Sequence, residues 1–253
     1  MNRDLLQPAY VLHRRDYGDT SLLLEIFTAG HGRLPVVAKG ARRARRAGSS
    51  QAALLQPYQP LLLAWSGRGE VKTLTRAEPA GRAPMLVGDA LYCGFYVNEL
   101  LLRLLGRQDG DQVIFAAYQT VLAELAGGGD VETGLRRFEL TLLGQLGYRP
   151  PLDRDADTGE PIRADLRYVC DPERGPVPAP PGEVPSAAAG VVSGATLLAL
   201  QAGAELAAVQ AREARDLMRL LLAPHLGERP LQSRALFAAR RRAEVGAFGD
   251  RPL

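Results

Sequence analysis

The sequence predicts an α+β fold: an N-terminal five-stranded β-barrel of the OB type, followed by a mainly α-helical C-terminal domain with a loop or hairpin excursion. Two observations predict it. Hydrophobic residues occur in short runs bounded by turns up to about residue 80, and from Pro84 onward they recur with helical spacing. The chain of 253 residues is long enough for two domains, which we place at residues 1–80 and 81–253.

Five segments of the first domain are rich in Val, Ile, Leu, Thr and aromatic residues. They are residues 9–15, 20–28, 33–39, 54–66 and 71–78. Five short strands fit a small closed barrel whose loops border a nucleic-acid-binding face, with a small sandwich or an SH3-like barrel as the alternative. Pro35 lies inside the third segment, so we expect an edge or a bulge there, because proline cannot donate to a ladder.

Six segments of the second domain have helical periodicity. They are residues 83–106, 111–129, 130–147, 193–203, 211–227 and 231–242. Asp130 and Ser233 are candidate N-caps of two of them. Between about residues 150 and 185 the chain is rich in Pro, Gly and Asp, and this stretch predicts a loop or a small hairpin excursion.

Positive charge is concentrated in the first domain. Residues 1–80 contain twelve Lys and Arg against six Asp and Glu, a net charge of +6, so the other 173 residues carry −3 of the chain's net charge of +3. This asymmetry predicts that the first domain faces a polyanion.

The stretch VAKGARRARRAGSSQ, residues 37–51, holds the densest group of cations. Glycine and serine around them let the backbone follow a phosphate chain without a fixed geometry. If all five cations neutralised phosphates of a single strand, they would contribute about −3.5 to the slope of log K against log salt, as an upper limit. The alternative is a solvated charge run. The predicted DNA-binding residues are Lys39, Arg42, Arg43, Arg45 and Arg46 of this loop, extended by Arg14, Arg15, Lys72 and Arg76.

Aromatic residues of the first domain could stack on bases. The candidates are Tyr10, Tyr17, Tyr58 and Trp65, and for each of them a place in the barrel core is the alternative.

Catalysis is not predicted. None of the three histidines belongs to a motif with a nucleophilic serine or cysteine, and the phosphate-binding, zinc-protease and nucleophile-elbow motifs are absent from the sequence. We therefore predict a protein without catalytic residues or a cofactor. No apolar run is long enough to span a membrane, and the first residues do not read as a signal peptide, so we expect a cytoplasmic protein.

Four blocks of the sequence resemble the RecO family of bacterial DNA repair proteins. They are residues 11–43, 54–78, 136–148 and 225–237. The resemblance covers nearly the whole chain. It implies an OB domain, a helical domain and a non-enzymatic recombination mediator that binds single- and double-stranded DNA, anneals strands, engages the single-stranded-DNA-binding protein SSB, and works with RecR to load RecA. It also implies association with the nucleoid.

The tail of SSB is acidic and ends in an aromatic residue with a free carboxylate. Such a ligand needs a cation beside an apolar hollow, and Arg136 and Leu140, spaced i and i+4 on one helix face, would supply both. The alternative is an ordinary amphipathic helix with Leu140 in the core and Arg136 in solvent.

Some members of the RecO family, which this sequence resembles, carry a structural zinc site in the excursion at about residues 150–185. That site is built from two Cys-x-x-Cys pairs. Here Asp155 and Thr158 stand at the first pair, and Cys170 and Glu173 at the second. One thiolate with two carboxylates is a poor tetrahedral zinc set, so we predict no metal. A degenerate, zinc-ribbon-like excursion without its metal is expected to be either mobile or held by packing alone.

A rival interpretation from another class stays open. The chain could be a non-catalytic scaffold or interaction module whose basic loop binds RNA, an acidic protein or anionic lipid.

Overall fold

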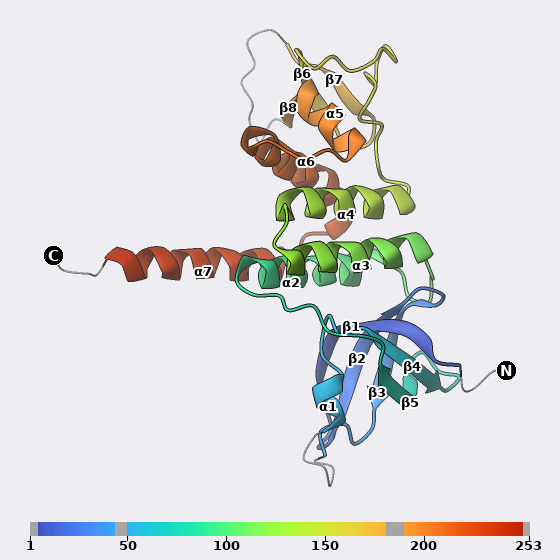
Figure 1. The fold of residues 1–253 in the computed structure, drawn as a ribbon. Helices are drawn as coiled ribbons and strands as arrows, with labels where there is room; N and C mark the ends of the chain where they lie inside the picture. The colour runs from blue at the N-terminus through green and yellow to red at the C-terminus, as the bar shows by residue number, and fades with distance from the viewer. Residues whose placement is uncertain (1–4, 44–49, 181–189, 250–253) are drawn as a thin grey trace. The chain divides into compact units, whose positions relative to one another are not determined.

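The computed structural model describes residues 5–43, 50–180 and 190–249, with side chains described up to Arg240. It has the predicted α+β fold, with an N-terminal closed five-stranded barrel followed by a helical region (Figure 1). Packing divides the chain into two compact units. Unit 1 comprises the residues up to Ala126 together with those from Pro230, and unit 2 comprises Gly127–Arg229.

The barrel is built from five strands and one short helix. These are β1 (Gln7–Tyr17), β2 (Ser21–Thr28), β3 (Gly32–Ala38), α1 (Gln51–Leu54), β4 (Leu61–Ser66) and β5 (Lys72–Pro79). The strand order is β1-β2-β3-β5-β4, and β4 pairs back onto β1 to close the barrel. Four of the pairings are antiparallel, and β3 runs parallel to β5.

Pro35 lies where β3 has a strand partner on one side. It is paired with Glu25 of β2, whereas the pairing of β3 with β5 begins at Val36. The strand as a whole is not an edge, because β3 lies between β2 and β5 in the closed barrel, and the β2–β3 ladder runs through Pro35 without a bulge. Pro35 is tolerated at a position that has a strand partner on one side only.

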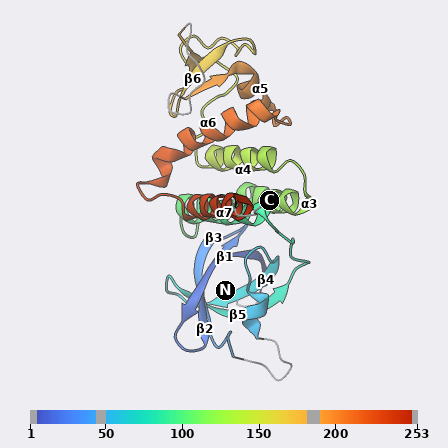
Figure 2. The same cartoon turned by 90° about the vertical axis from the view of Figure 1, so that its left-hand side faces the viewer.

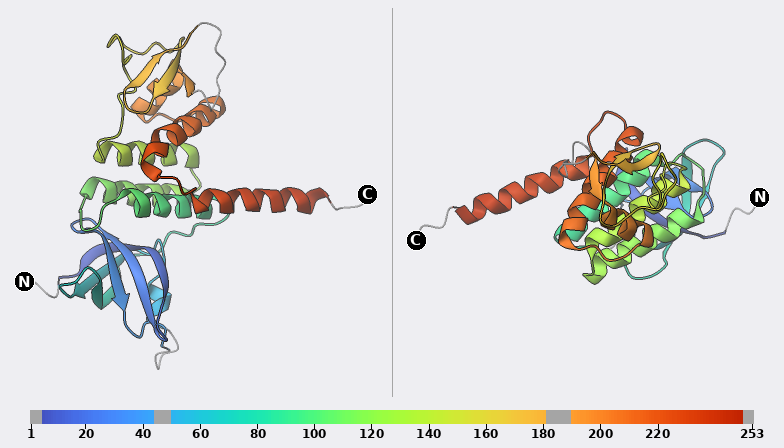
Figure 3. Two further views of the ribbon diagram at one scale, coloured as in Figure 1. Left: turned by 180° about the vertical axis from the view of Figure 1, so that it is seen from behind. Right: turned by 90° about the horizontal axis from the view of Figure 1, so that it is seen from above.

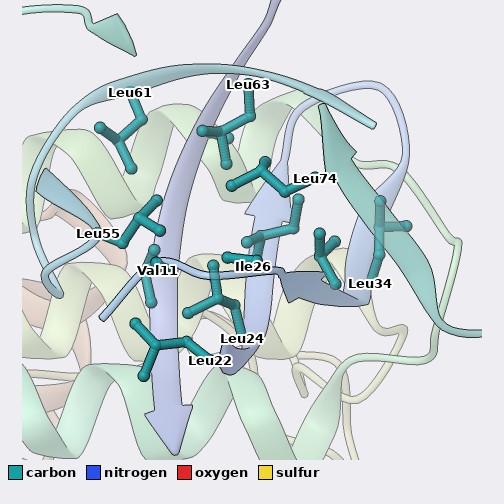
Figure 4. Packing of buried hydrophobic residues seen from close by; sticks show 13 residues of the cluster. Val11, Leu22, Leu24, Ile26, Leu34, Leu55, Leu61, Leu63 and Leu74 are labelled. Atoms are coloured by element: carbon teal, nitrogen blue, oxygen red, sulfur yellow. The ribbon is translucent and has the colours of Figure 1, made fainter. Parts of the chain in front are cut away.

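The barrel interior is filled with aliphatic side chains (Figure 4). Along β2, Leu22, Leu24 and Ile26 are at most 3% exposed, as expected when alternate residues face the core. Each such side chain contributes roughly 1.5–3 kcal/mol when fully buried. The remaining members come from the other four strands and from one residue after β3 and one after α1: Ala9, Val11, Leu34, Val36, Ala38, Ala41, Leu55, Leu61, Leu63 and Leu74.

The fourth predicted strand is shorter than expected. The sequence predicted residues 54–66, but β4 begins at Leu61, and the preceding residues form α1 and a turn. Pro57 and Pro60 flank this turn, and Tyr58 has a φ of 66°, a left-handed conformation that a strand does not allow.

Three helices complete unit 1: α2 (Asp89–Leu104), α3 (Gln112–Gly127) and α7 (Gln232–Gly249). Helix α2 is tied to the barrel by a buried chain of hydrogen bonds. The hydroxyl of Tyr118 in α3 donates to Asn98 Oδ1 (2.8 Å), and Asn98 Nδ2 donates to the carbonyl of Leu12 in β1 (2.9 Å). The sequence placed the start of this helix near Pro84; it begins five residues later.

Gly94 of α2 provides the space that the turn before β4 needs. A Cβ at this position would lie 2.8 Å from Leu86 Cδ1 and 3.0 Å from the ring of Tyr58. A side chain would therefore require Leu86 and the Tyr58 ring to shift. This requirement links α2 to the left-handed turn described above.

The N-terminus of α7 is capped from another helix. Glu99 of α2 accepts hydrogen bonds from the backbone N–H groups of Gln232 and Ser233 (both 2.9 Å) and from the Ser233 hydroxyl (2.7 Å). The bonds from Ser233 and Gln232 lower the pKa of Glu99 although burial opposes this. The prediction of Ser233 as the N-cap is wrong, because its hydroxyl donates to Glu99 from inside the helix. Helix α7 runs on beyond α2 (Figure 3).

Unit 2 consists of helices and a small sheet (Figure 2). Its elements are α4 (Val131–Gln145), β6 (Arg167–Asp171), β7 (Gly175–Pro178), β8 (Val191–Ser193), α5 (Gly194–Ala202) and α6 (Ala208–Leu226). The three strands have the order β7-β6-β8, so the excursion contains the hairpin predicted as one alternative. Asp130 caps α4 as predicted, accepting from the N–H groups of Glu132 and Thr133.

Among the described residues, no helix combines the length and the apolar character that crossing a membrane requires.

Candidate functional site

The first candidate site is one end of the barrel, which we call the basic end. It is formed by the β1–β2 turn and by residues 39–43 after β3. Leu22 of β2 pairs with Ala38 on one side and with Asp16 on the other, which brings the two segments together. The side chains of Lys39 and Arg43 are exposed here.

Arg42 has a different environment from its neighbours. Its guanidinium forms an ion pair with Asp16 and donates to the carbonyls of Gly18 (3.1 Å) and Asp19. Its backbone N–H also donates to the Thr20 carbonyl (2.9 Å). Arg42 therefore fixes the start of the basic loop to the β1–β2 turn.

The base of the basic loop is closed. Ala41 is fully buried in the barrel core, and its carbonyl accepts from the N–H of Ala52 (2.9 Å), so the loop leaves and rejoins the barrel at one place. Arg14 supports the returning side, since its Nη1 donates to the carbonyls of Ala52 (2.9 Å) and Leu55 (3.5 Å). Arg45 and Arg46 lie outside the described residues.

The end of β1 adds two exposed groups to the basic end. Arg15 is exposed, and it is paired with Leu23. Tyr17 is 53% exposed at the turn, beside Asp16 in sequence. Arg14 is opposite the inward-facing Leu24, which explains why it is half-buried while Arg15 is not.

The other two predicted cations, Lys72 and Arg76, both lie on β5. Lys72 begins β5, and its Nζ donates to the carbonyls of Gly67 (3.4 Å) and Gly69 (2.8 Å) in the β4–β5 turn. Arg76, further along β5, pairs with Glu78, with 2.7 Å between Nε and Oε1. Both are held by their own strand or turn.

Three of the four aromatic candidates pack into the unit. Tyr10 is 5% exposed, with its ring 5.0 Å from that of Tyr118, and Tyr58 is 7% exposed. Trp65 is half-buried and stands edge-on to His31, with 5.4 Å between ring centroids. Tyr17 is therefore the candidate that lies open to solvent at the basic end.

The second candidate site is a cavity of about 290 Å³ in unit 2, which we call the arginine pocket. Predicted residues Arg136 and Leu140 both line it. The full lining is Thr133, Arg136, Arg137, Leu140, Thr141, Arg149, Leu200, Gln201, Ala202, Gly203, Ala204 and Leu206. The predicted pairing of a cation with an apolar side chain at one hollow is thus present.

Arg136 is not in solvent, as the amphipathic-helix alternative assumed. Its Nε lies 2.6 Å from Oε2 of Glu139, its Nη2 donates to Oε1 (3.0 Å), and its Nη1 is 3.6 Å from a Glu132 oxygen. The side chains of Arg136 and Glu139 are 6% and 1% exposed. Leu140 is 3% exposed, as that alternative expected.

Two arginines that the sequence did not single out lie at the pocket beside Arg136. Arg149 donates from Nη2 to Oε1 of Gln201 (2.7 Å), and Arg137 points an Nη2 toward the Gly203 carbonyl (3.5 Å). Arg149 follows a helix end in a loop, and no periodic pattern marks such a position. Only the packing of α4 and its following loop against the end of α5 brings these side chains to one cavity.

Within the described ranges, no three His, Cys, Asp or Glu side chains gather as a metal site would require. The two cysteines form no disulfide; Cys93 is half-buried and Cys170 is buried.

Comparisons with known proteins extend over nearly all of the chain. Residues 1–82 match the family model for the recombination protein O N terminal, and residues 85–235 match that for the recombination protein O C terminal. A DNA repair protein RecO from Methylococcus capsulatus is 50% identical over 236 residues, which is 93% of this chain and 94% of that relative.

Further relatives agree. A DNA repair protein RecO from Nitrosococcus oceani is 46% identical over 251 residues, or 99% of this chain and all of that protein. One from Nitrosospira multiformis is 45% identical over 234 residues, covering 92% and 95% of the two chains. With both family models matched in order and relatives aligned along almost their entire length, this chain belongs to the RecO family.

Proposed function

We propose that this chain is a non-enzymatic DNA-binding protein of recombinational DNA repair. It anneals complementary strands and acts as a mediator with RecR and SSB to help load RecA on single-stranded DNA. Relatives named DNA repair protein RecO support the repair role. It would act on chromosomal DNA in the cytoplasm, in association with the nucleoid.

The observation that carries the DNA-binding part is the closed base of the basic loop. Because Ala41 is buried and Arg42 is fixed to the β1–β2 turn, the exposed cations Lys39 and Arg43 project from a rigid anchor. Cations held in this way can contact phosphates of either single or double strands, and such contacts are indifferent to sequence.

Tyr17 would add a second kind of contact. A base stacked on an exposed aromatic ring contributes roughly 1–3 kcal/mol, and only unpaired bases can offer a free face. Arg15, Arg43 and Tyr17 would then hold a single strand by its backbone and by one base. This favours unpaired strands ready for annealing.

The arginine pocket supports the partner role. A tail that ends in an apolar residue and a carboxylate would place the apolar group against Leu140 and Leu206, and the carboxylate near Arg137 and Arg149. Arg136 would shape the pocket wall from its buried pair with Glu139. Tail binding would bring the protein to SSB-covered strands, where RecR and then RecA act.

The DNA part is tested by titrating labelled single-stranded DNA at two salt concentrations. The variant R43A/R45A/R46A should lose affinity severalfold or more, and its salt slope should flatten by about 2, because each lost single-strand contact is worth about 0.7. The matched control R154A/R163A/R219A removes three exposed arginines from unit 2 and should bind as the wild type does. An unchanged titration of the first variant would remove the loop from the DNA path.

Two further titrations distinguish the mediator function from the scaffold function. Single-stranded RNA and anionic phospholipid vesicles are titrated with the same proteins. A loop-dependent contact with RNA or vesicles but none with DNA would favour the scaffold function over the mediator function.

The mediator part is tested by annealing complementary strands that are first covered with SSB. We expect the wild type to anneal them and R43A/R45A/R46A to be slow on both naked and covered strands. Failure of the wild type on covered strands would contradict the mediator role while leaving DNA binding intact.

A further inference from the structure

The excursion at residues 150–180 does not fit the zinc ion that some members of the family hold there. Cys170 of β6 is 3% exposed and is the one cysteine among the four positions of that site. A zinc ligand must be a thiolate, and structural sites use four N or S ligands. Asp155, Thr158 and Glu173 at the other three positions cannot complete such a set.

Two turns stand at the positions of the two Cys-x-x-Cys pairs, and Asp155 closes the first of them by hydrogen bonds. Its carboxylate accepts from the N–H of Asp157 (2.9 Å) and from the hydroxyl of Thr158 (2.8 Å). Its backbone N–H donates to the Glu160 carbonyl (2.8 Å), and its carbonyl accepts from Gly159 N–H (2.9 Å), where φ is 73°. Asp155 and Thr158, which stand where the first Cys-x-x-Cys pair would have its two cysteines, are therefore joined directly by a hydrogen bond.

The second turn has the same design. The carboxylate of Asp171 accepts from the N–H groups of Glu173 and Arg174, both at 2.9 Å, and so closes the turn between β6 and β7. Such side-chain to backbone bonds are a common way for aspartate to hold a turn. These backbone bonds also lower the pKa of Asp171.

Two contacts fasten the first turn to the second. The N–H of Ala156 donates to the Pro176 carbonyl (2.8 Å), and Pro176 is paired with Cys170 across β6 and β7. Arg174 forms an ion pair with Asp157. The turn that begins at Asp155 thus lies beside the strand that carries Cys170, which is the arrangement a shared metal ion would otherwise impose.

We infer that the excursion is a metal-free counterpart of a zinc-knuckle pair, by which we mean two Cys-x-x-Cys turns that share one zinc ion. Here two aspartate-closed turns and the bonds between them replace the ion. The excursion was expected to be either mobile or held by packing alone. Instead, a hydrogen bond and an ion pair join its two turns. Unit 2 then needs no zinc for its order, and neither chelators nor oxidation of zinc-binding thiols can open this region.

Metal analysis tests the first consequence. The purified full-length chain, loaded with excess zinc and then dialysed, should hold far less than one zinc per chain. Its thermal unfolding should be the same with and without EDTA. One tightly held zinc per chain, or a lower unfolding temperature in EDTA, would overturn the inference.

Hydrogen exchange tests the replacement itself. D155A should speed amide exchange at least tenfold in residues 155–162 and 175–177, with the rest of unit 2 unchanged. The matched control D165A removes an exposed aspartate of the same excursion, paired with Arg163, and should leave these amides slow. The milder D155N, which keeps one acceptor oxygen, should fall between them. Equal exchange in D155A and the wild type would refute the role of Asp155.

A gain-of-metal variant gives an independent readout. D155C/T158C/E173C restores four cysteines together with Cys170. We expect it to bind one zinc per chain and, with zinc, to regain the slow exchange that D155A loses. Failure to bind zinc would contradict the claim that the two turns occupy the positions of a zinc-knuckle pair.

Discussion

The basic end and the arginine pocket each contain an arginine that the sequence assigned to ligand binding, and each arginine is already in an ion pair. Arg42 pairs with Asp16, and their side chains are 33% and 69% exposed. Arg136 pairs with Glu139, and theirs are 6% and 1% exposed. The two pairs differ mainly in their access to water.

This difference decides what each arginine can do. An exposed pair is worth roughly 0–1 kcal/mol, so a phosphate can compete with Asp16 for Arg42 at little cost. A buried pair has no such freedom, because removing one partner strands the other charge. Arg42 is therefore available to a ligand, whereas Arg136 is a fixed part of the pocket wall.

The largest expected effect follows from the buried pair. R136A should lower the free energy of unfolding by about 3–5 kcal/mol, because the buried carboxylate of Glu139 would lose the guanidinium it pairs with. Chemical denaturation monitored by circular dichroism measures it. R42A should change the free energy of unfolding by about 1 kcal/mol or less under the same conditions.

A double variant separates burial from the pair itself. R136M/E139L replaces both charges by apolar side chains of similar length and should recover most of the stability that R136A loses. If R136A were as stable as R42A, the contrast between the two sites would collapse.

The second effect concerns Arg149, one of the two pocket arginines that the sequence did not single out. An acidic peptide that ends in a free carboxylate should bind R149E at least tenfold more weakly than the wild type, a loss of about 1.4 kcal/mol. Calorimetry or fluorescence anisotropy measures it. R219E, which reverses an exposed charge on α6 outside the pocket lining, should bind as the wild type does.

The amidated form of the same peptide shows whether Arg149 reads the carboxylate. Amidation should weaken binding to the wild type but add little to the loss in R149E. Equal effects of amidation on both proteins would assign the carboxylate to another residue.

The sequence was informative wherever local pattern decides structure. The short run of Leu, Ile, Phe and Thr at residues 20–28 predicts β2, and Asp130 before a helical stripe predicts the start of α4, because both patterns depend on near neighbours in the sequence. The shared face of Arg136 and Leu140 follows from helical spacing in the same way.

The sequence could not predict the side-chain contacts between residues that lie far apart in the chain. The Glu99 cap of α7 joins residues 134 apart, and the contact of Arg149 with Gln201 spans 52. The pairing of Arg42 with Asp16 crosses 26 residues and gives a predicted DNA-contact residue a second role as an anchor of the loop. Such contacts arise from tertiary packing, which periodicity does not encode.

The smallest effect tests whether that anchor holds back a DNA contact. D16N should free Arg42 for a phosphate, so affinity for single-stranded DNA should rise severalfold and the salt slope should steepen by about 0.7. D19N removes the same charge from the same turn, but Arg42 contacts only the backbone carbonyl of Asp19, so the pair with Asp16 survives. The gain in D16N should therefore exceed that in D19N, and only D16N should steepen the slope. Equal gains would mean that loss of acidic charge alone explains them, and Arg42 would then serve only to fix the loop to the barrel.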